Sequence, residues 1–186
     1  CPPRPPVASN ASGSLPDMLS DAIAFAADAH KGQTRKDSGL PYVTHPLEVM
    51  VLLIRHGVRD EALLSAAVLH DVVEDCGISV AEMTERFGAA VTDIVTALSK
   101  APGLPAAERK QRALEQLRSG PPGAKTVKMA DRLSNLLDME RISWSTEKKS
   151  AYLREADEIA AIGEGELPAL ADELRRVAAA QRVRIA

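Results

Sequence analysis

The segment EALLSAAVLHDVVED, residues 61–75, decides the fold that this sequence predicts. It is almost wholly apolar until His70, so we expect a helix buried at the centre of the domain. Asp60 precedes this helix and is a suitable N-cap residue. The segment then ends on four polar residues, which are His70, Asp71, Glu74 and Asp75. Carboxylates buried at the end of an apolar helix are unfavourable without partners, so these side chains indicate a functional site.

The rest of the chain has apolar residues at helical spacing, interrupted by turn residues. Helices are expected at residues 18–30, 46–57, 61–75, 79–88, 89–100, 106–119, 124–141, 146–162 and 166–184. No strand or internal repeat is indicated. Hydrophobic residues make up 45% of the chain but aromatic residues only 3%, so aliphatic side chains must fill the core. This composition favours packed helices over a sheet. The predicted fold class is therefore all-α, a bundle of roughly nine helices.

The 186 residues suit one domain, which we place at residues 18–186. Residues 1–17 are rich in Pro, Ser and Ala, so we expect a flexible leader without a core of its own. The formal net charge of -3 gives no global basic field and predicts no nucleic-acid partner. No apolar run approaches the roughly 20 residues that a membrane helix needs, so no membrane partner is expected. Two cysteines, Cys1 and Cys76, cannot form a disulfide framework, which favours a reducing cytoplasm.

Two further residues join the His70-Asp71 pair, namely His45 in PYVTHP and Asp131 in KMADRLSNL. Two imidazoles and two carboxylates in the order H…HD…D can hold one divalent cation and leave coordination positions open. This mixture of nitrogen and oxygen ligands excludes a structural thiolate zinc site. It suits Mn²⁺, Fe²⁺ or Zn²⁺, and it is typical of a metal-dependent hydrolase.

Each member of this set also has an ordinary interpretation. His45 alone could hydrogen-bond the backbone at a helix start, and Asp131 alone could be an ordinary surface carboxylate paired with Lys128 or Arg132. The sequence also leaves open whether His30, near the end of the first expected helix, replaces or assists His45. The longer blocks in which these residues stand favour the metal site.

Those blocks resemble the RelA/SpoT-type HD-domain hydrolases, and specifically the stand-alone small alarmone hydrolases. The blocks are AHKGQTRKDSGLPYVTHP (29–46), LLSAAVLHDVVEDCGIS (63–79), RFGAAVTDIVTALSK (86–100) and PGAKTVKMADRLSNLLD (122–138). The similarity runs from about residue 18 to near the end of the chain. Four long blocks in the right order are far more specific than an isolated H…HD…D pattern.

The resemblance implies an all-α HD domain that binds one Mn²⁺ through His45, His70, Asp71 and Asp131. It implies hydrolysis of the 3′-pyrophosphate of guanosine tetraphosphate or pentaphosphate (ppGpp or pppGpp) to GDP or GTP and pyrophosphate, which lowers alarmone levels. The implied catalytic residues are Glu74, Asp75 and Asn135. The implied substrate-binding residues are Arg35, Lys36, Lys148 and Tyr152. We add Lys128, because a cation beside Asp131 could offset the charge of a phosphate.

The resemblance ends with the hydrolase domain, so we expect hydrolysis without synthesis. The expected partner is the guanosine nucleotide substrate. A homo-oligomer and a cognate alarmone synthetase toxin are left open as further partners. Two alternative functions also stay open at this point. One is an HD phosphohydrolase acting on another nucleotide such as NADPH, and the other is a non-catalytic nucleotide-binding or partner-binding module.

Overall fold

The structure is a computed structural model, and it describes residues 17–35, 38–99, 103 and 105–185. Within these residues the secondary structure is helical, apart from one isolated antiparallel bridge between Thr34 and Pro41. The helices are α1 (Asp17–Ala29), α2 (Thr44–Arg55), α3 (Glu61–Leu69), α4 (Val72–Cys76), α5 (Val80–Leu98), α6 (Ala106–Ser119), α7 (Ala124–Leu137), η1 (Met139–Arg141), α8 (Thr146–Gly163) and α9 (Pro168–Ile185). The predicted all-α class is confirmed.

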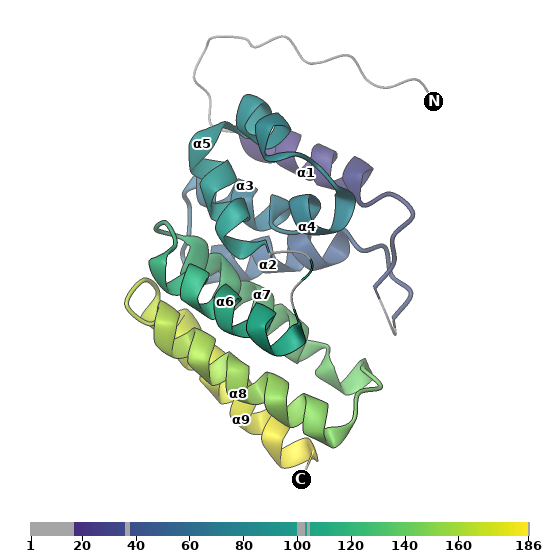
Figure 1. Ribbon diagram of the computed structural model, residues 1–186, viewed down its shortest axis with the longest axis vertical. Helices are drawn as coiled ribbons and strands as arrows, with labels where there is room; N and C mark the ends of the chain where they lie inside the picture. The colour runs from purple at the N-terminus through teal and green to yellow at the C-terminus, as the bar shows by residue number, and fades with distance from the viewer. Residues whose placement is uncertain (1–16, 36–37, 100–102, 104, 186) are drawn as a thin grey trace.

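The helices form two groups that meet at α7. Figure 1 shows α1 to α5 in the upper half of the molecule and α6 to α9 in the lower half. Helix α3 packs against α1, α2 and α5, whereas α8 and α9 pack against each other. Helix α7 packs against α2 on one side and against α8 and α9 on the other. The central position of α7 explains why so many of its residues are buried.

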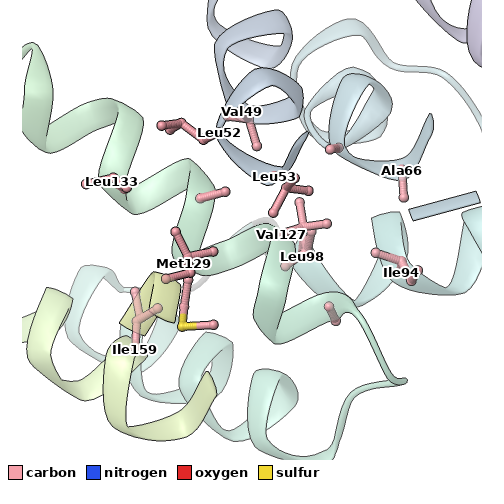
Figure 2. Close-up of a cluster of buried hydrophobic side chains, with 14 of the residues drawn as sticks. Val49, Leu52, Leu53, Ala66, Ile94, Leu98, Val127, Met129, Leu133 and Ile159 are labelled. Atoms are coloured by element: carbon pink, nitrogen blue, oxygen red, sulfur yellow. The ribbon is translucent and has the colours of Figure 1, made fainter. Parts of the chain in front are cut away.

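The contact between α2 and α7 is a continuous apolar layer. Val49 and Leu53 of α2 are fully buried, as are Val127, Met129 and Leu133 of α7. Figure 2 shows Leu53 of α2 beside Val127 of α7, whereas Met129 points away from α2 toward Ile159 of α8. Burying an aliphatic side chain contributes about 1.5–3 kcal/mol, so this layer fixes the two helices relative to each other. Polar residues on the same helices are thereby brought to fixed positions beside the core.

The helix predicted at residues 61–75 is interrupted, which corrects the expectation of one continuous helix. Helix α3 ends at Leu69, and α4 begins at Val72. The ring of His70 provides a physical reason, because its Nδ1 lies 2.8 Å from the carbonyl oxygen of Ala67. An uninterrupted helix would use that carbonyl for the backbone N–H of Asp71. A side chain that competes for a backbone group in this way ends a helix.

The local signals for helix ends are otherwise good predictors. The side chain of Asp60 accepts a hydrogen bond from the backbone N–H of Leu63, as expected of an N-cap. Ser79 caps α5 in the same way. The helices predicted at 79–88 and 89–100 are one element with a kink at Gly88, whose φ is +77°. The helix predicted at 124–141 ends earlier, because α7 is followed by the separate turn η1.

Two predictions concern residues at the margin of what the structure describes. The predicted leader, residues 1–17, lies outside the described residues except for Asp17, where α1 begins. Lys36 also lies outside them. Among the helices of the described ranges, none combines the length and the apolar character that crossing a membrane requires.

Gly123 is a position at which alanine should destabilise the fold. Its φ is +90°, and a Cβ built there would lie 2.7 Å from Cδ1 of Leu63. A non-glycine residue in this backbone conformation is strained by about 1–3 kcal/mol. We expect Gly123→Ala to lower the free energy of unfolding by about that amount, as measured by urea denaturation.

Gly165 is the matched control, because its φ is not positive and a Cβ there meets no atom within 4 Å. The exposed Gly165→Ala variant should change the free energy of unfolding by no more than about 0.5 kcal/mol. Equal stability of the two variants would contradict the strain assigned to Gly123.

Candidate metal-dependent active site

Three helices bring the predicted metal ligands together. His45 lies in the first turn of α2, His70 follows α3, and Asp131 lies in the middle of α7. One ligand atom from each of these three buried residues lies within 4.8 Å of the others. His45 Nε2 is 3.2 Å from Asp131 Oδ1. Asp71 completes the cluster, because its Oδ2 lies 3.1 Å from His70 Nε2 and 3.9 Å from His45 Nε2.

The tautomer of each histidine follows from the partner of its Nδ1 atom. The carbonyl oxygen of Ala67 can only accept, so His70 Nδ1 donates its proton there. The hydroxyl of Ser134 donates to Glu48 Oε2 at 3.0 Å, and it therefore accepts from His45 Nδ1 at 3.1 Å. In the neutral form of each ring, Nε2 therefore carries the lone pair, and this atom faces the cluster. Metal-binding histidines are held in this way, with the second ring nitrogen donating to a neighbour.

Both carboxylates are held by donors from nearby residues. Lys128 Nζ donates to Asp131 Oδ2 at 2.7 Å, and Asn135 Nδ2 donates to Asp131 Oδ1 at 2.7 Å. The hydroxyl of Tyr42 donates to Asp71 Oδ2 at 2.6 Å. The ordinary interpretation of Asp131 as a surface carboxylate is wrong, because its side chain is only 10% exposed. Asp131 does, however, pair with Lys128, as that interpretation expected.

The electrostatics of the cluster favour positive charge between these side chains. Burial opposes protonation of His70, but the carboxylates of Asp71 and Asp131 outweigh it and raise the pKa of His70 to about 9. Burial favours a neutral Asp131, but the ammonium of Lys128 and the neighbouring imidazoles hold its pKa well below the usual range. Burial and the charge of Asp71 raise the pKa of Tyr42, so its phenol remains a donor. The site therefore attracts a cation.

The donor set fits a divalent metal ion. His70 Nε2 is buried and makes no hydrogen bond within the part of the chain that the structure describes, although carboxylate oxygens lie nearby. Two lone pairs that face two carboxylates repel unless a positive charge lies among them. Imidazole and carboxylate ligands suit Mn²⁺, Fe²⁺ or Zn²⁺. The cluster of His45, His70 and Asp131 could therefore hold a metal ion, with Asp71 beside it.

The predicted catalytic carboxylates lie on α4, directly after Asp71. Glu74 and Asp75 are both exposed, in contrast to the buried cluster. Gln33 Nε2 donates to the backbone carbonyl of Asp75 at 3.2 Å, which ties α4 to the loop that precedes His45. The charge of Asp75 contributes to the raised pKa of Tyr42. The two carboxylates thus stand on the solvent side of the helix that begins beside the cluster.

His30 lies near the metal-site cluster, but its contacts are with Tyr42, Gln33 and Cys76. Its ring stacks on Tyr42 at 4.8 Å between centroids, and its Nδ1 lies 2.8 Å from Gln33 Oε1. Its other close contact is with Cys76 Sγ, at 3.2 Å. The histidine that groups with His70 and Asp131 is His45. His30 therefore packs behind Tyr42 and does not replace His45.

Arg35, predicted to bind substrate, is bonded to two carboxylates of the protein. Its Nη1 lies 2.8 Å from Glu48 Oε2 and its Nη2 lies 3.0 Å from Asp138 Oδ2. The guanidinium therefore ties the loop before His45 to α2 and to the end of α7. The predicted role of Arg35 in substrate binding stays a prediction.

Lys148 and Tyr152 lie on α8 in an aromatic cluster. The ammonium of Lys148 lies 4.2 Å from the centre of the Trp144 ring, and the guanidinium of Arg132 lies 3.7 Å from the centre of the Tyr152 ring. Arg132 Nη2 also lies 2.6 Å from Glu155 Oε1. This cluster joins α8 to α7 next to Asp131. The contacts of Lys148 and Tyr152 are with Trp144 and Arg132, so their predicted role in substrate binding does not depend on the metal-site prediction.

Sequence reasoning did not find Tyr42 and Ser134, which contact the predicted ligands Asp71 and His45, or Glu48, which bonds Ser134. Glu48 is one helical turn after His45, and Ser134 is almost one turn after Asp131. Spacing alone marks both as neighbours of a ligand. Their bond to each other joins α2 to α7, so it could not be read from either segment. Tyr42 stands three residues before His45 in a loop, where no periodicity applies.

Comparisons with known proteins agree with this geometry. A model of the HD domain family matches residues 22–162. The guanosine-3′,5′-bis(diphosphate) 3′-pyrophosphohydrolase MESH1 of Mus musculus is 40% identical over 152 residues, which cover 79% of this chain and 85% of that protein. The guanosine-3′,5′-bis(diphosphate) 3′-pyrophosphohydrolase of Vibrio cholerae is 34% identical over 149 residues, which cover 77% of this chain but 21% of that protein.

The fold agrees with a solved structure as well. A metazoan orthologue of SpoT that hydrolyses ppGpp superposes with a TM-score of 0.82 and 29% sequence identity. The superposition covers 92% of this chain and 98% of that protein. The similarity therefore extends over nearly the whole chain.

Proposed function

The chain belongs to the HD-domain family, in its RelA/SpoT-type branch, and from this premise we propose that it hydrolyses the 3′-pyrophosphate of ppGpp and pppGpp with Mn²⁺ as cofactor. The products are GDP or GTP and pyrophosphate. The relatives named above, which carry this activity in their names, supply the substrate. The small number of cysteines supports a cytoplasmic location as part of the same proposal.

The observation that carries the proposal is the buried cluster of His45, His70 and Asp131. Within the described residues, its His70 Nε2 atom has no hydrogen-bond partner. We assign the ion to these three residues and to Asp71. A divalent cation held there supplies Lewis-acid chemistry and makes water a nucleophile near neutral pH. The attack breaks the bond between the ribose 3′-oxygen and its phosphorus, and the 3′-oxygen leaves with a proton.

The remaining residues have roles that follow from their positions. Glu74 and Asp75 are accessible to solvent, so we assign the proton transfers of the reaction to this pair without dividing the roles. Asn135 holds Asp131. Lys128 uses one of its three N–H donors on Asp131, and the others are available to a phosphate oxygen. Arg35, Lys36, Lys148 and Tyr152 are proposed contacts with the nucleotide.

A nucleotide panel with defined metals tests the proposal. The purified protein is stripped with a chelator, reloaded with Mn²⁺, Mg²⁺ or Zn²⁺, and incubated with ppGpp, pppGpp, GTP or NADPH. We expect GDP and pyrophosphate from ppGpp in the Mn²⁺ sample and none in the stripped sample. We also expect Mn²⁺ to raise the melting temperature, because an ion that binds the native state stabilises it.

Each other outcome has a definite meaning. Turnover of NADPH without turnover of ppGpp would assign the site to another nucleotide. Binding of ppGpp without turnover in the metal-loaded protein would support a non-catalytic module. Either result would contradict the proposed reaction. A homo-oligomer and a cognate synthetase stay predictions that this assay does not address.

A further inference from the structure

A chain of hydrogen bonds extends from His45 away from the candidate metal site. His45 Nδ1 lies 3.1 Å from Ser134 Oγ, and Ser134 Oγ lies 3.0 Å from Glu48 Oε2. Arg35 then contacts the same Glu48 oxygen at 2.8 Å. The inner bonds are shielded, since His45 is 3% exposed and Ser134 is 2% exposed. Glu48 itself reaches solvent, because its side chain is 51% exposed.

We propose that Ser134 and Glu48 are positioning residues that set the tautomer of His45 and thereby the affinity of the site for its metal. The inference rests on the proposed function, in which His45 is a ligand. It assigns a role to two residues that do not contact the ion. Ser134 acts directly on His45, whereas Glu48 acts through Ser134.

The directions of the two hydrogen bonds at Ser134 decide which nitrogen of His45 carries the proton. A hydroxyl has one proton to donate, and the carboxylate of Glu48 accepts it. Ser134 Oγ can then only accept from His45, so the proton of the ring stays on Nδ1. The lone pair of His45 is therefore on Nε2, the atom that lies 3.2 Å from Asp131. Partners of this kind fix the ring and raise its basicity as a ligand.

Removing Glu48 should reverse this arrangement. The hydroxyl of Ser134 would be free to donate to His45 Nδ1, which would place the ring proton on Nε2 and block the ligand atom. Removing Ser134 has a different effect, because Nδ1 loses its acceptor and neither tautomer is favoured by that contact. Glutamine at position 48 keeps a carbonyl oxygen that can accept from Ser134, so this change should be tolerated.

Glu48 and Ser134 also line an open groove between α2 and α7 with a volume of about 460 Å³. Leu47, Val51 and Leu137 form its apolar walls. A small carboxylic acid can therefore reach the position of a missing Glu48 side chain. Arg35 stands beside that position and would hold the added carboxylate. The groove makes chemical rescue of the Glu48→Ala variant possible.

The experiment measures two properties that do not depend on turnover. ¹⁵N chemical shifts of the metal-free protein report which nitrogen of His45 carries the proton, and isothermal titration gives the dissociation constant for Mn²⁺. We expect Glu48→Ala to move the proton toward Nε2, and both Glu48→Ala and Ser134→Ala to weaken Mn²⁺ binding about 10- to 100-fold. Glu48→Gln should remain within about threefold of the unmodified protein, which is well below the roughly 10- to 100-fold loss expected of the alanine variants.

Two controls separate this role from a loss of packing. Ser65 has a buried hydroxyl without a hydrogen-bond partner in the described part of the chain, so Ser65→Ala removes the same atom with no bond to a ligand. It should leave the Mn²⁺ affinity unchanged. Formate in the millimolar range should restore Mn²⁺ affinity in Glu48→Ala but not in Ser134→Ala, which lacks the hydroxyl that relays the effect.

The outcomes distinguish this inference from the proposed function. Absence of Mn²⁺ binding and ppGpp hydrolysis in the unmodified protein would contradict the proposed function itself. Normal binding and hydrolysis there, with an unchanged His45 tautomer and Mn²⁺ affinity in Glu48→Ala and Ser134→Ala, would overturn the positioning role alone. Equal losses in Ser65→Ala and Ser134→Ala would overturn it as well, since they would indicate an effect of packing.

Discussion

Replacing Asp71 with alanine is expected to abolish hydrolysis of ppGpp and to weaken Mn²⁺ binding. Asp71 Oδ2 lies 3.1 Å from His70 Nε2, and Tyr42 donates to the same oxygen. Without Asp71 the buried cluster keeps one carboxylate, and the ammonium of Lys128 already offsets the charge of that group. Removing one partner from a buried ionic cluster costs about 3–5 kcal/mol. If the metal-bound state alone carried that loss, metal binding would be roughly 10²- to 10⁴-fold weaker.

Activity and Mn²⁺ affinity should be measured on the same purified sample, after circular dichroism shows a helical protein. Asp93 offers a matched control, because it is an exposed aspartate in the middle of α5. Asp93→Ala should keep both hydrolysis and Mn²⁺ binding. Near-normal hydrolysis by metal-loaded Asp71→Ala would rule out Asp71 as a ligand.

The fold could be predicted because its signals are local. Capping residues such as Asp60 and Ser79 act within one turn, and an apolar segment such as 61–69 is buried in any compact arrangement of helices. The interruption after Leu69 could not be predicted in the same way. It depends on the ring of His70 bonding the carbonyl of Ala67, and helical spacing gives no sign of that choice.

The candidate site was predictable to the extent that its residues stand in recognisable blocks. His45, His70 and Asp131 come from segments far apart in the sequence, and the resemblance of those segments predicted them, with Asp71, as ligands. The structure brings the four side chains together, and their role as ligands stays a prediction. Lys128 illustrates the limit of a charge argument. Its expected role was phosphate binding, yet its ammonium also holds Asp131 at 2.7 Å, a pairing that the sequence offered only as an alternative to the metal site.

The contacts around the ligands were outside the reach of sequence reasoning. The bond between Glu48 and Ser134 crosses from α2 to α7, and it forms because these two helices pack against each other. Tyr42 reaches Asp71 from the loop between α1 and α2, which contains the antiparallel bridge between Thr34 and Pro41. Such contacts are set by tertiary packing, so they follow from the fold and not from any pattern in one segment.

The second large effect is expected at the acidic pair on α4, where loss of turnover should occur without loss of metal. Glu74 and Asp75 are exposed and lie outside the buried group of His45, His70 and Asp131. A general acid or base contributes about 10²- to 10⁴-fold to a rate. We expect the Glu74→Gln and Asp75→Asn double variant to lose kcat by that factor, while its dissociation constant for Mn²⁺ stays within about threefold, because no ligand is removed.

The single variants divide the roles, because amides keep the size of the side chains but remove their negative charge and their ability to exchange protons. The variant that lacks the base should lose the acidic limb of the pH profile of kcat/KM, since that limb reports the ionisation of the base in the free enzyme. Glu85→Gln, an exposed change on α5, should leave kcat and the pH profile unchanged. A parallel loss of Mn²⁺ affinity and kcat in either single variant would instead make that residue a metal ligand, and the proton transfers would then belong to the other carboxylate.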